Sequence, residues 1–341
     1  MFRTLCTLGC LLVALPAWAQ DGKGYYRFPT IHGETIVFAA EGDLWRVPVT
    51  GGRAQRLTTH PGEETATIIS PDGRTVAFSG TYEGGTELYT MPLAGGLPIR
   101  WTYDGDAATA TAWTPDGRLV YSTRHYATLP DPQLVVIDLA DGTRERIPLA
   151  EATEATYDAT GDTLLFVRPS FHGNVTKRYR GGTVRKIWRF ATGAAEAETL
   201  TPDYVGESHS PVWWDDRVYF VTDRDGTMNL WSMEEAGTGL RQHTRHAGWD
   251  LRDPAVSTGR LVYQVGQLQC PRRQPARAVL AVARRVVCRP DGDGDRQRRP
   301  GTGRHRQPSE LVVRAVTGWP KSAGATRERP LGLRRAPALT R

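Results

Sequence analysis

The residues best suited to nucleophilic chemistry are Ser208, His209 and Ser210. A serine nucleophile needs a general base within hydrogen-bond reach, and a Gly-x-Ser-x-Gly motif often marks such a serine. The sequence contains no such motif, and adjacent residues on an extended chain point to opposite sides. We therefore interpret this segment as a polar loop before a strand, and we predict that the chain has no catalytic residue of its own.

Residues that could bind a metal ion are few and poorly spaced. His243 and His246 have a near-helical spacing, but no third ligand lies near them in the sequence. Residues 291–295 begin like a calcium loop, yet Arg296 and Thr302 occupy the positions that require Gly and Glu. A His-Glu-x-x-His motif, a P-loop and a dinucleotide-binding glycine turn are absent. We expect neither a metal ion nor another cofactor.

One cluster of cations could bind a ligand. Six of them fall within thirteen residues: Lys177, Arg178, Arg180, Arg185, Lys186 and Arg189. One hypothesis is a basic lip, formed by Lys177, Arg178, Arg180 and Arg185, that guides acidic groups or peptide C-termini. The other is a solvated loop whose cations pair with acidic neighbours, as exposed cations commonly do.

The net charge of +6 hides a division of the chain into two parts. Residues 267–341 contain 17 Arg, one Lys and five acidic residues, a net of +13. Residues 1–266 contain 25 cations and 32 anions, a net of −7. Nucleic-acid-binding tails usually mix Lys with Arg and interleave aromatic residues, whereas Trp319 is the one aromatic residue after position 266. We therefore expect no nucleic acid as a partner.

The first residues have the pattern of a secretory signal. Arg3 supplies the positive start, Leu5–Leu15 the apolar run and Ala17–Ala19 a small-x-small cleavage site. The run is too short to span a bilayer, and no later stretch approaches about 18 consecutive apolar residues. We predict a signal peptide over residues 1–19 and a periplasmic or secreted protein without a membrane span.

Short apolar runs recur along the acidic part of the chain. Their aromatic anchors are Phe38, Phe78, Tyr121, Phe166, Phe220 and Tyr263, with spacings of 40, 43, 45, 54 and 43 residues. A turn precedes each run, most clearly at residues 70–74 and 114–118, where Pro-Asp-Gly favours a tight hairpin. A repeat of 40–50 residues built from short strands is typical of β-propeller blades.

A second strand follows each anchor and contains a polar-aliphatic-aromatic triplet. The copies begin at residues 43, 87, 186 and 229, and a degenerate copy, Gln-Leu-Val, begins at residue 133. Alternation puts the aliphatic and the aromatic side chain on opposite faces, as expected for a strand between two neighbouring sheets. The sequence therefore predicts an all-β, six-bladed propeller over residues 20–266.

The propeller segment resembles the N-terminal propeller of tricorn-type serine proteases. The resemblance rests on Gly-Tyr-Tyr-Arg-Phe-Pro at 24–29, Asp-Leu-Trp-Arg-Val-Pro at 43–48, and the segments 177–183 and 218–224. The Ser-Pro-Asp-Gly turn is also shared by TolB-like propellers. The resemblance implies a peptidase that degrades oligopeptides, with a second propeller, a PDZ-like domain and a catalytic region after the first propeller.

No catalytic region of that kind fits in the 75 residues after Gly266. The resemblance therefore implies a non-catalytic propeller whose partners are peptides or the remaining protease domains, with a homo-oligomer left open. The alternative is a stand-alone TolB-like propeller that acts as a protein-interaction module.

The sixth repeat stops after its second strand. Residues 267–273 replace the expected third strand, and the sequence that follows is rich in Arg and Pro. We expect an incomplete sixth blade with an unpaired strand edge, and a tail at 267–341 that is disordered or encoded out of frame. A frameshift near codon 266 predicts that another reading frame encodes the missing triplet.

Overall fold

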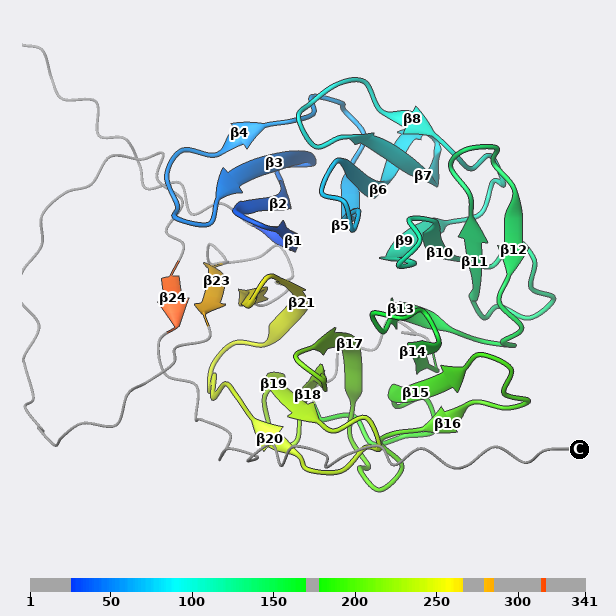
Figure 1. The fold of residues 1–341 in the computed structure, drawn as a ribbon, viewed down its shortest axis with the longest axis vertical. Coiled ribbons are helices and arrows are strands. Elements are labelled where there is room, and N and C mark those ends of the chain that lie inside the picture. The colour runs from blue at the N-terminus through cyan, green and yellow to red at the C-terminus, as the bar shows by residue number, and fades with distance from the viewer. Residues whose placement is uncertain (1–25, 170–177, 266–278, 285–313, 317–341) are drawn as a thin grey trace, which may run out of the picture.

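Every regular element that the structure describes is a β-strand. The computed structural model describes residues 26–169, 178–265, 279–284 and 314–316. The strands form six four-stranded sheets, each built from four strands that are consecutive in the sequence (Figure 1). Among the described residues there is no helix with the length and apolar character needed to cross a membrane.

The strands of the first three sheets are β1 (Arg27–His32), β2 (Thr35–Ala40), β3 (Asp43–Pro48), β4 (Gln55–Arg56), β5 (Glu64–Ile69), β6 (Thr75–Glu83), β7 (Gly85–Pro92), β8 (Ile99–Arg100), β9 (Ala108–Trp113), β10 (Leu119–Thr123), β11 (Gln133–Ile137) and β12 (Arg144–Arg146). Those of the last three are β13 (Thr153–Tyr157), β14 (Thr163–Arg168), β15 (Lys186–Ala191), β16 (Glu198–Thr199), β17 (Ser208–Trp214), β18 (Arg217–Thr222), β19 (Asn229–Met233), β20 (Arg241–Gln242), β21 (Leu251–Ser257), β22 (Arg260–Val265), β23 (Val279–Arg284) and β24 (Arg314–Val316).

The sheets are arranged as the blades of a propeller. The first strand of each sheet lies next to the central axis, and the later strands lie successively farther out (Figure 1). All strand pairs in the first five sheets are antiparallel. The predicted all-β propeller is therefore confirmed, and we call the sheets blades 1 to 6 in chain order.

Each predicted anchor is fully buried between its own blade and the preceding one. Phe78 lies in a cluster with Val37 and Leu44 of blade 1, and Phe220 lies with Leu165 and Ile187 of blade 4. The remaining anchors, Phe38, Tyr121, Phe166 and Tyr263, occupy equivalent clusters at the other four blade interfaces. Burying one such ring stabilises the fold by about 1.5–3 kcal/mol, so every blade depends on its neighbour.

The triplets place their side chains on two faces, as predicted. Leu44 and Leu88 pack toward the following blade, whereas Trp45 and Tyr89 pack toward the preceding one. The strand that carries each triplet is also held by a threonine. The backbone amides of Leu44, Leu88 and Leu230 donate hydrogen bonds of 2.8, 2.9 and 2.9 Å to Thr58, Thr102 and Thr244 Oγ1, respectively.

The sixth sheet departs from the other five. β21 and β22 follow the repeat, and β23 pairs antiparallel with β22, so the strand edge that we expected to be unpaired is covered. However, β24 pairs parallel with β23, which no outer strand of the first five blades does. The last blade therefore has four strands, not the two that we predicted, but its outer strand breaks the antiparallel meander of the other blades, which is consistent with an incomplete final blade.

The first two strands of blade 6 close the ring against blade 1. Val262 packs in the cluster that contains Phe38. The turn between β21 and β22 adds two hydrogen bonds of 3.1 Å: Gly33 N–H donates to Ser257 Oγ, and Arg260 Nη1 donates to the Gly33 carbonyl. Closure thus depends on packing and turn contacts.

Candidate functional site

Five inner strands contain a non-glycine residue with a left-handed backbone. These residues are Phe28, Ala66, Glu154, Ser210 and Asp253, with φ between 48° and 51°. Each lies where the register of the inner strand shifts, which identifies a β-bulge. A bulge re-aims side chains and is common next to functional sites. In blades 4 to 6 the bulge residues are Glu154, Ser210 and Asp253, which lie on the strands next to the central axis, the hub of the propeller (Figure 1).

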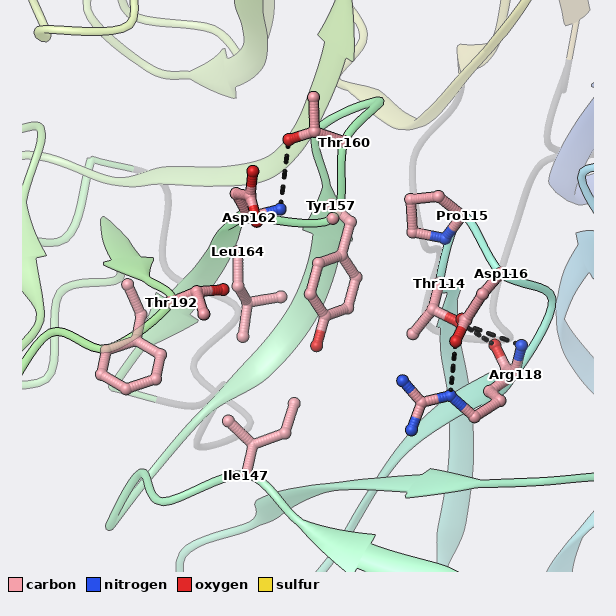
Figure 2. A pocket seen from close by; sticks show the side chains of 12 residues that line it. Thr114, Pro115, Asp116, Arg118, Ile147, Tyr157, Thr160, Asp162, Leu164 and Thr192 are labelled. Atoms are coloured by element: carbon pink, nitrogen blue, oxygen red, sulfur yellow. Dashed lines mark hydrogen bonds and ion pairs between the residues drawn. The ribbon is translucent and has the colours of Figure 1, made fainter.

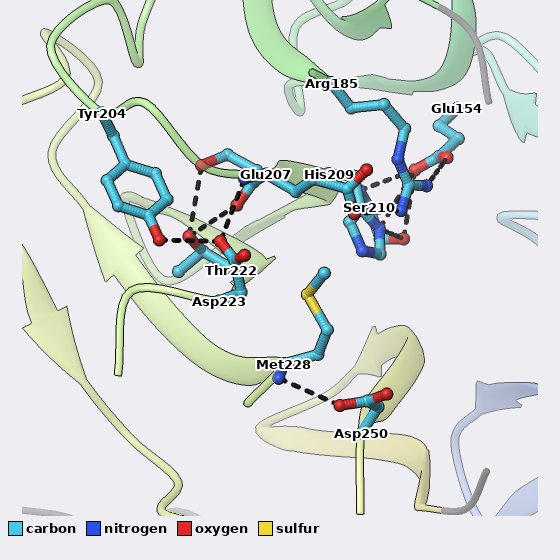
Figure 3. Close-up of polar contacts among 11 residues, drawn as sticks. Glu154, Arg185, Tyr204, Glu207, His209, Ser210, Thr222, Asp223, Met228 and Asp250 are labelled. Carbon is cyan, nitrogen blue, oxygen red and sulfur yellow. Dashed lines mark hydrogen bonds and ion pairs between the residues drawn. The ribbon is translucent and has the colours of Figure 1, made fainter. Parts of the chain in front are cut away.

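A polar network at this hub joins blades 4 and 5 (Figure 3). The Arg185 guanidinium contacts Glu154 Oε1 at 3.0 Å and Glu207 Oε2 at 3.1 Å. Glu154 Oε2 accepts hydrogen bonds from the Ser210 amide at 2.7 Å and from Ser210 Oγ at 3.1 Å. His209 Nδ1 lies 2.9 Å from Ser210 Oγ and 3.6 Å from Glu154 Oε2. We call these five residues the hub network.

Burial and charge together set the protonation of the hub network. Desolvation favours the neutral form of Glu154, but hydrogen bonding with His209, the Arg185 charge and the Ser210 amide outweigh it and hold its pKa well below the usual range. Desolvation and the Arg185 charge lower the pKa of His209. Near neutral pH Glu154 is therefore a carboxylate and His209 a neutral imidazole.

The hub network does not have the geometry of a Ser-His-acid triad. In such a triad the serine contacts one imidazole nitrogen and the acid contacts the other. Here Ser210 Oγ and Glu154 Oε2 both lie nearest to His209 Nδ1, and Ser210 donates directly to Glu154. The carboxylate thus competes with the imidazole for the serine proton, and its depressed pKa makes it a weak base.

The structure corrects our interpretation of Ser208–Ser210 in two respects. The segment belongs to the inner strand β17 and is not a loop. His209 and Ser210 also contact each other, although neighbours on a regular strand point apart, because the positive φ of Ser210 turns its side chain at the bulge. Nothing in the sequence marked Glu154, Glu207 or Asp253 as members of this region.

Asp253 gives the hub a pH-dependent stability. Burial raises its pKa to about 6, with a further contribution from Glu154 that the Arg252 charge opposes. A carboxyl whose folded pKa exceeds its unfolded value stabilises the fold fully below the unfolded pKa, and this contribution is lost as the pH rises through the folded pKa. Above pH 6 the folded protein therefore contains a half-buried carboxylate that destabilises it.

We expect the Asp253→Asn variant to have a free energy of unfolding about 1–3 kcal/mol higher than the unchanged chain at pH 8. Asn also tolerates the left-handed backbone at this position. The gain should shrink between pH 8 and pH 5, which urea unfolding at both pH values will measure. Asp216→Asn is the control, since Asp216 is exposed and has φ 60°. An equal gain at both pH values would contradict the assignment.

The predicted basic lip is divided by the fold. Arg185 is buried in the hub network, whereas Arg178 and Arg180 are exposed. Arg178 Nε donates to the Gly226 carbonyl at 3.1 Å, which ties the loop to blade 5. Lys177 lies outside the described residues. Arg189 lies on strand β15, not in a loop, and pairs with the exposed Glu198 and Glu235.

The two histidines with near-helical spacing have different surroundings. Desolvation, with smaller effects of Arg217 and Arg241, lowers the pKa of His243 to about 4. The His243 ring stacks on Tyr219 with 4.9 Å between centroids, and its Nε2 lies 2.8 Å from Ser232 Oγ. His246 packs edge-on to Tyr263. Both are half-buried packing residues.

Metal-binding groups of three or more His, Cys, Asp or Glu residues are absent from the part of the chain that the structure describes. The sequence motif at residues 291–295 lies outside that part.

Two of the surface clefts that the described residues form are candidate binding sites. One, of about 300 Å³, lies between blades 3 and 4, where Tyr157, Leu164 and Phe190 form apolar walls (Figure 2). At its rim Arg118 Nε pairs with Asp116 Oδ2 at 2.9 Å, so the charges there largely neutralise each other. The second cleft, of about 480 Å³, lies on blade 4 and is lined by Arg168, Arg180 and Lys186.

Comparisons with known proteins agree with this architecture. Residues 23–269 match the family described as the tricorn protease N-terminal beta propeller domain. Tricorn protease homolog 1 of Streptomyces coelicolor is 34% identical over 248 residues, which cover 70% of this chain and 22% of that protein. The chain thus spans about a fifth of the length of the curated relatives that it matches first.

Solved structures show the same fold. The crystal structure of the tricorn protease aligns with a TM-score of 0.65 and 22% identity, covering 80% of this chain and 27% of that one. TolB from Acinetobacter baumannii aligns with a TM-score of 0.54 and 20% identity, covering 68% and 57% of the two chains. The repeat of anchors, the ring of blades and the match over residues 23–269 lead to one conclusion: the chain belongs to the tricorn protease N-terminal β-propeller family.

Proposed function

We propose that this chain is the non-catalytic propeller of an exported tricorn-like peptidase, and that it binds oligopeptides without cleaving them. The observation that carries the proposal is the family match over residues 23–269, which covers blades 1 to 5 and the first two strands of blade 6. The geometry of the hub network supports the non-catalytic role, because Ser210 donates its proton to a carboxylate of depressed pKa. Residues 1–19 support export, since they have the pattern of a cleavable signal.

We attribute the composition of residues 267–341 to a frameshift. Three observations support this part of the proposal. The Arg- and Pro-rich composition begins where the sixth repeat breaks, the family match stops at residue 269, and β24 pairs in the parallel sense. Within the same proposal, the partners of the propeller are peptides or the remaining domains of an intact peptidase.

The test is to express the full chain with its own leader in a bacterium and to purify it from the periplasmic fraction. The mature protein should begin at Gln20, should leave fluorogenic oligopeptides intact, and should bind acidic peptides. The Arg178→Ala/Arg180→Ala double variant should bind these peptides more weakly, since both side chains are exposed cations. Arg74→Ala, which changes an exposed cation of blade 2, is the control.

Two results would contradict the proposal. Hydrolysis that disappears in a Ser210→Ala variant would show that the chain is an enzyme. If the protein stays in the cytoplasm and keeps residues 1–19, export is excluded. The second candidate function is a TolB-like protein-interaction module, which the fold similarity to TolB favours. It predicts binding to a folded protein and no affinity for free peptides.

A further inference from the structure

The cleft on blade 4 has an unusual concentration of positive charge. Arg168, Arg180 and Lys186 line its volume of about 480 Å³, and none of the described residues that line it is acidic. Its size falls within the range of about 300–1,000 Å³ that is typical of small-molecule sites. The cations come from the end of β14, the start of β15 and the loop between them.

Strand pairing forces two of these cations together. Arg168 and Lys186 are direct register partners across β14 and β15. Like charges directly opposite each other destabilise a sheet, so a bound anion would relieve a repulsion that the fold itself creates. Burial, aided by the nearby Arg224 charge and opposed by Asp223, lowers the pKa of Lys186.

The carboxylates near the cleft neutralise this charge only in part. Glu151 reaches Arg168 Nε at 3.8 Å, which is longer than a hydrogen bond. Asp223 Oδ1 already accepts from the Tyr204 hydroxyl at 2.7 Å and from the Glu207 amide at 3.0 Å. Within the described residues the cations of the cleft are thus only partly neutralised, so an anion there would still be attracted.

Two aromatic rings form the rest of the recognition surface. The Arg168 guanidinium lies 5.2 Å from the centre of the Trp188 ring. Lys186 Nζ and the Arg224 guanidinium lie 5.8 and 4.1 Å from the centre of the Tyr204 ring. Trp188 is half-buried, and Val205 beside Tyr204 is 58% exposed, so an apolar wall adjoins the cations. A ligand with an aromatic ring next to its anionic group would contact both surfaces at once.

We propose that this cleft binds a small aromatic anion. Arg168, Arg180 and Lys186 hold its carboxylate or phosphate group, and its ring packs against Trp188 and Tyr204. Carboxylate and phosphate share the chemistry that these cations recognise, namely charge-assisted hydrogen bonds to anionic oxygens. The proposal goes beyond the peptide-binding role and does not depend on it.

The test is isothermal titration calorimetry on the purified full chain with indole-3-acetate and phenyl phosphate as probes. Acetate and inorganic phosphate lack the ring, and indole-3-acetamide lacks the charge. We expect at least one of the two aromatic anions to bind, and the three control compounds to bind at least about tenfold more weakly. The probe that binds more tightly identifies the anionic group.

Substitutions in the cleft test whether the aromatic anion binds there. Lys186→Gln and Arg180→Gln should each raise the Kd about tenfold, since each removes a charge-assisted hydrogen bond. Arg53→Gln, on an exposed turn of blade 1, should leave it unchanged. Because Arg180 is exposed, its variant tests the site even if Lys186→Gln impairs folding. Absence of binding by both aromatic anions, equal binding of the ringless anions, or an equal effect of Arg53→Gln would overturn the proposal.

Discussion

The Arg185→Met variant is expected to have a free energy of unfolding about 3–5 kcal/mol below that of the unchanged chain. Arg185 is 8% exposed and is the counterion of both Glu154 and Glu207. Its removal leaves two carboxylates at the hub without the cation that compensates their desolvation. Urea unfolding followed by tryptophan fluorescence will measure the change.

A matched control comes from the same basic segment. Arg189 also contacts two carboxylates, Glu198 and Glu235, but these are 69% and 59% exposed. Exposed ion pairs contribute at most about 1 kcal/mol, so Arg189→Met should have a small effect. Adding Glu207→Gln to Arg185→Met should restore part of the stability. If Arg185→Met and Arg189→Met lower the free energy of unfolding by similar amounts, Arg185 behaves as a surface cation and the hub network does not form in solution.

Replacing Phe38 with alanine is expected to lower the free energy of unfolding by about 3–5 kcal/mol, the usual range for a buried aromatic residue. Phe38 is 1% exposed and packs with Val262 of blade 6, at the interface where the two ends of the ring meet. The reason for the loss is the cavity that alanine leaves between two blades. The measurement is again urea unfolding of the full chain.

Phe78→Ala provides the comparison, because Phe78 is the equivalent anchor between blades 1 and 2, both of which are complete. If the two variants lower the free energy of unfolding equally, the interface between blades 6 and 1 is as tightly packed in solution as the interface between blades 1 and 2. A loss for Phe38→Ala of less than about 1 kcal/mol, beside a full loss for Phe78→Ala, would show an open ring despite the packing of Val262.

Much of the fold could be predicted from short-range patterns. The anchors at 38, 78, 121, 166, 220 and 263 are all fully buried, and each faces the preceding blade. The sequence revealed them because side chains alternate between the two faces of a β-strand, and because every blade must bury an apolar face against its neighbour. The threonines whose hydroxyl oxygens accept hydrogen bonds from the triplet strands were not predicted, since each lies 14 residues from the amide that donates to it, on the other side of a turn.

The candidate sites were much harder to predict. Arg185 looked like one more exposed cation in a basic segment, and only its contacts with Glu154 and Glu207 reveal a buried counterion. The repulsion between Arg168 and Lys186 depends on strand register, which the sequence of the long intervening loop does not specify.

By itself the sequence determined the all-β class, the repeat, the anchors, the resemblance to the family and the place where the repeat breaks. These follow from local periodicity, which burial on alternating faces imposes on each strand. The tertiary structure decided which charges meet. Inner-strand bulges occur at Glu154, Ser210 and Asp253, next to the axis, and the ring brings together groups from different blades. Such contacts join residues far apart in the chain, so no local pattern records them.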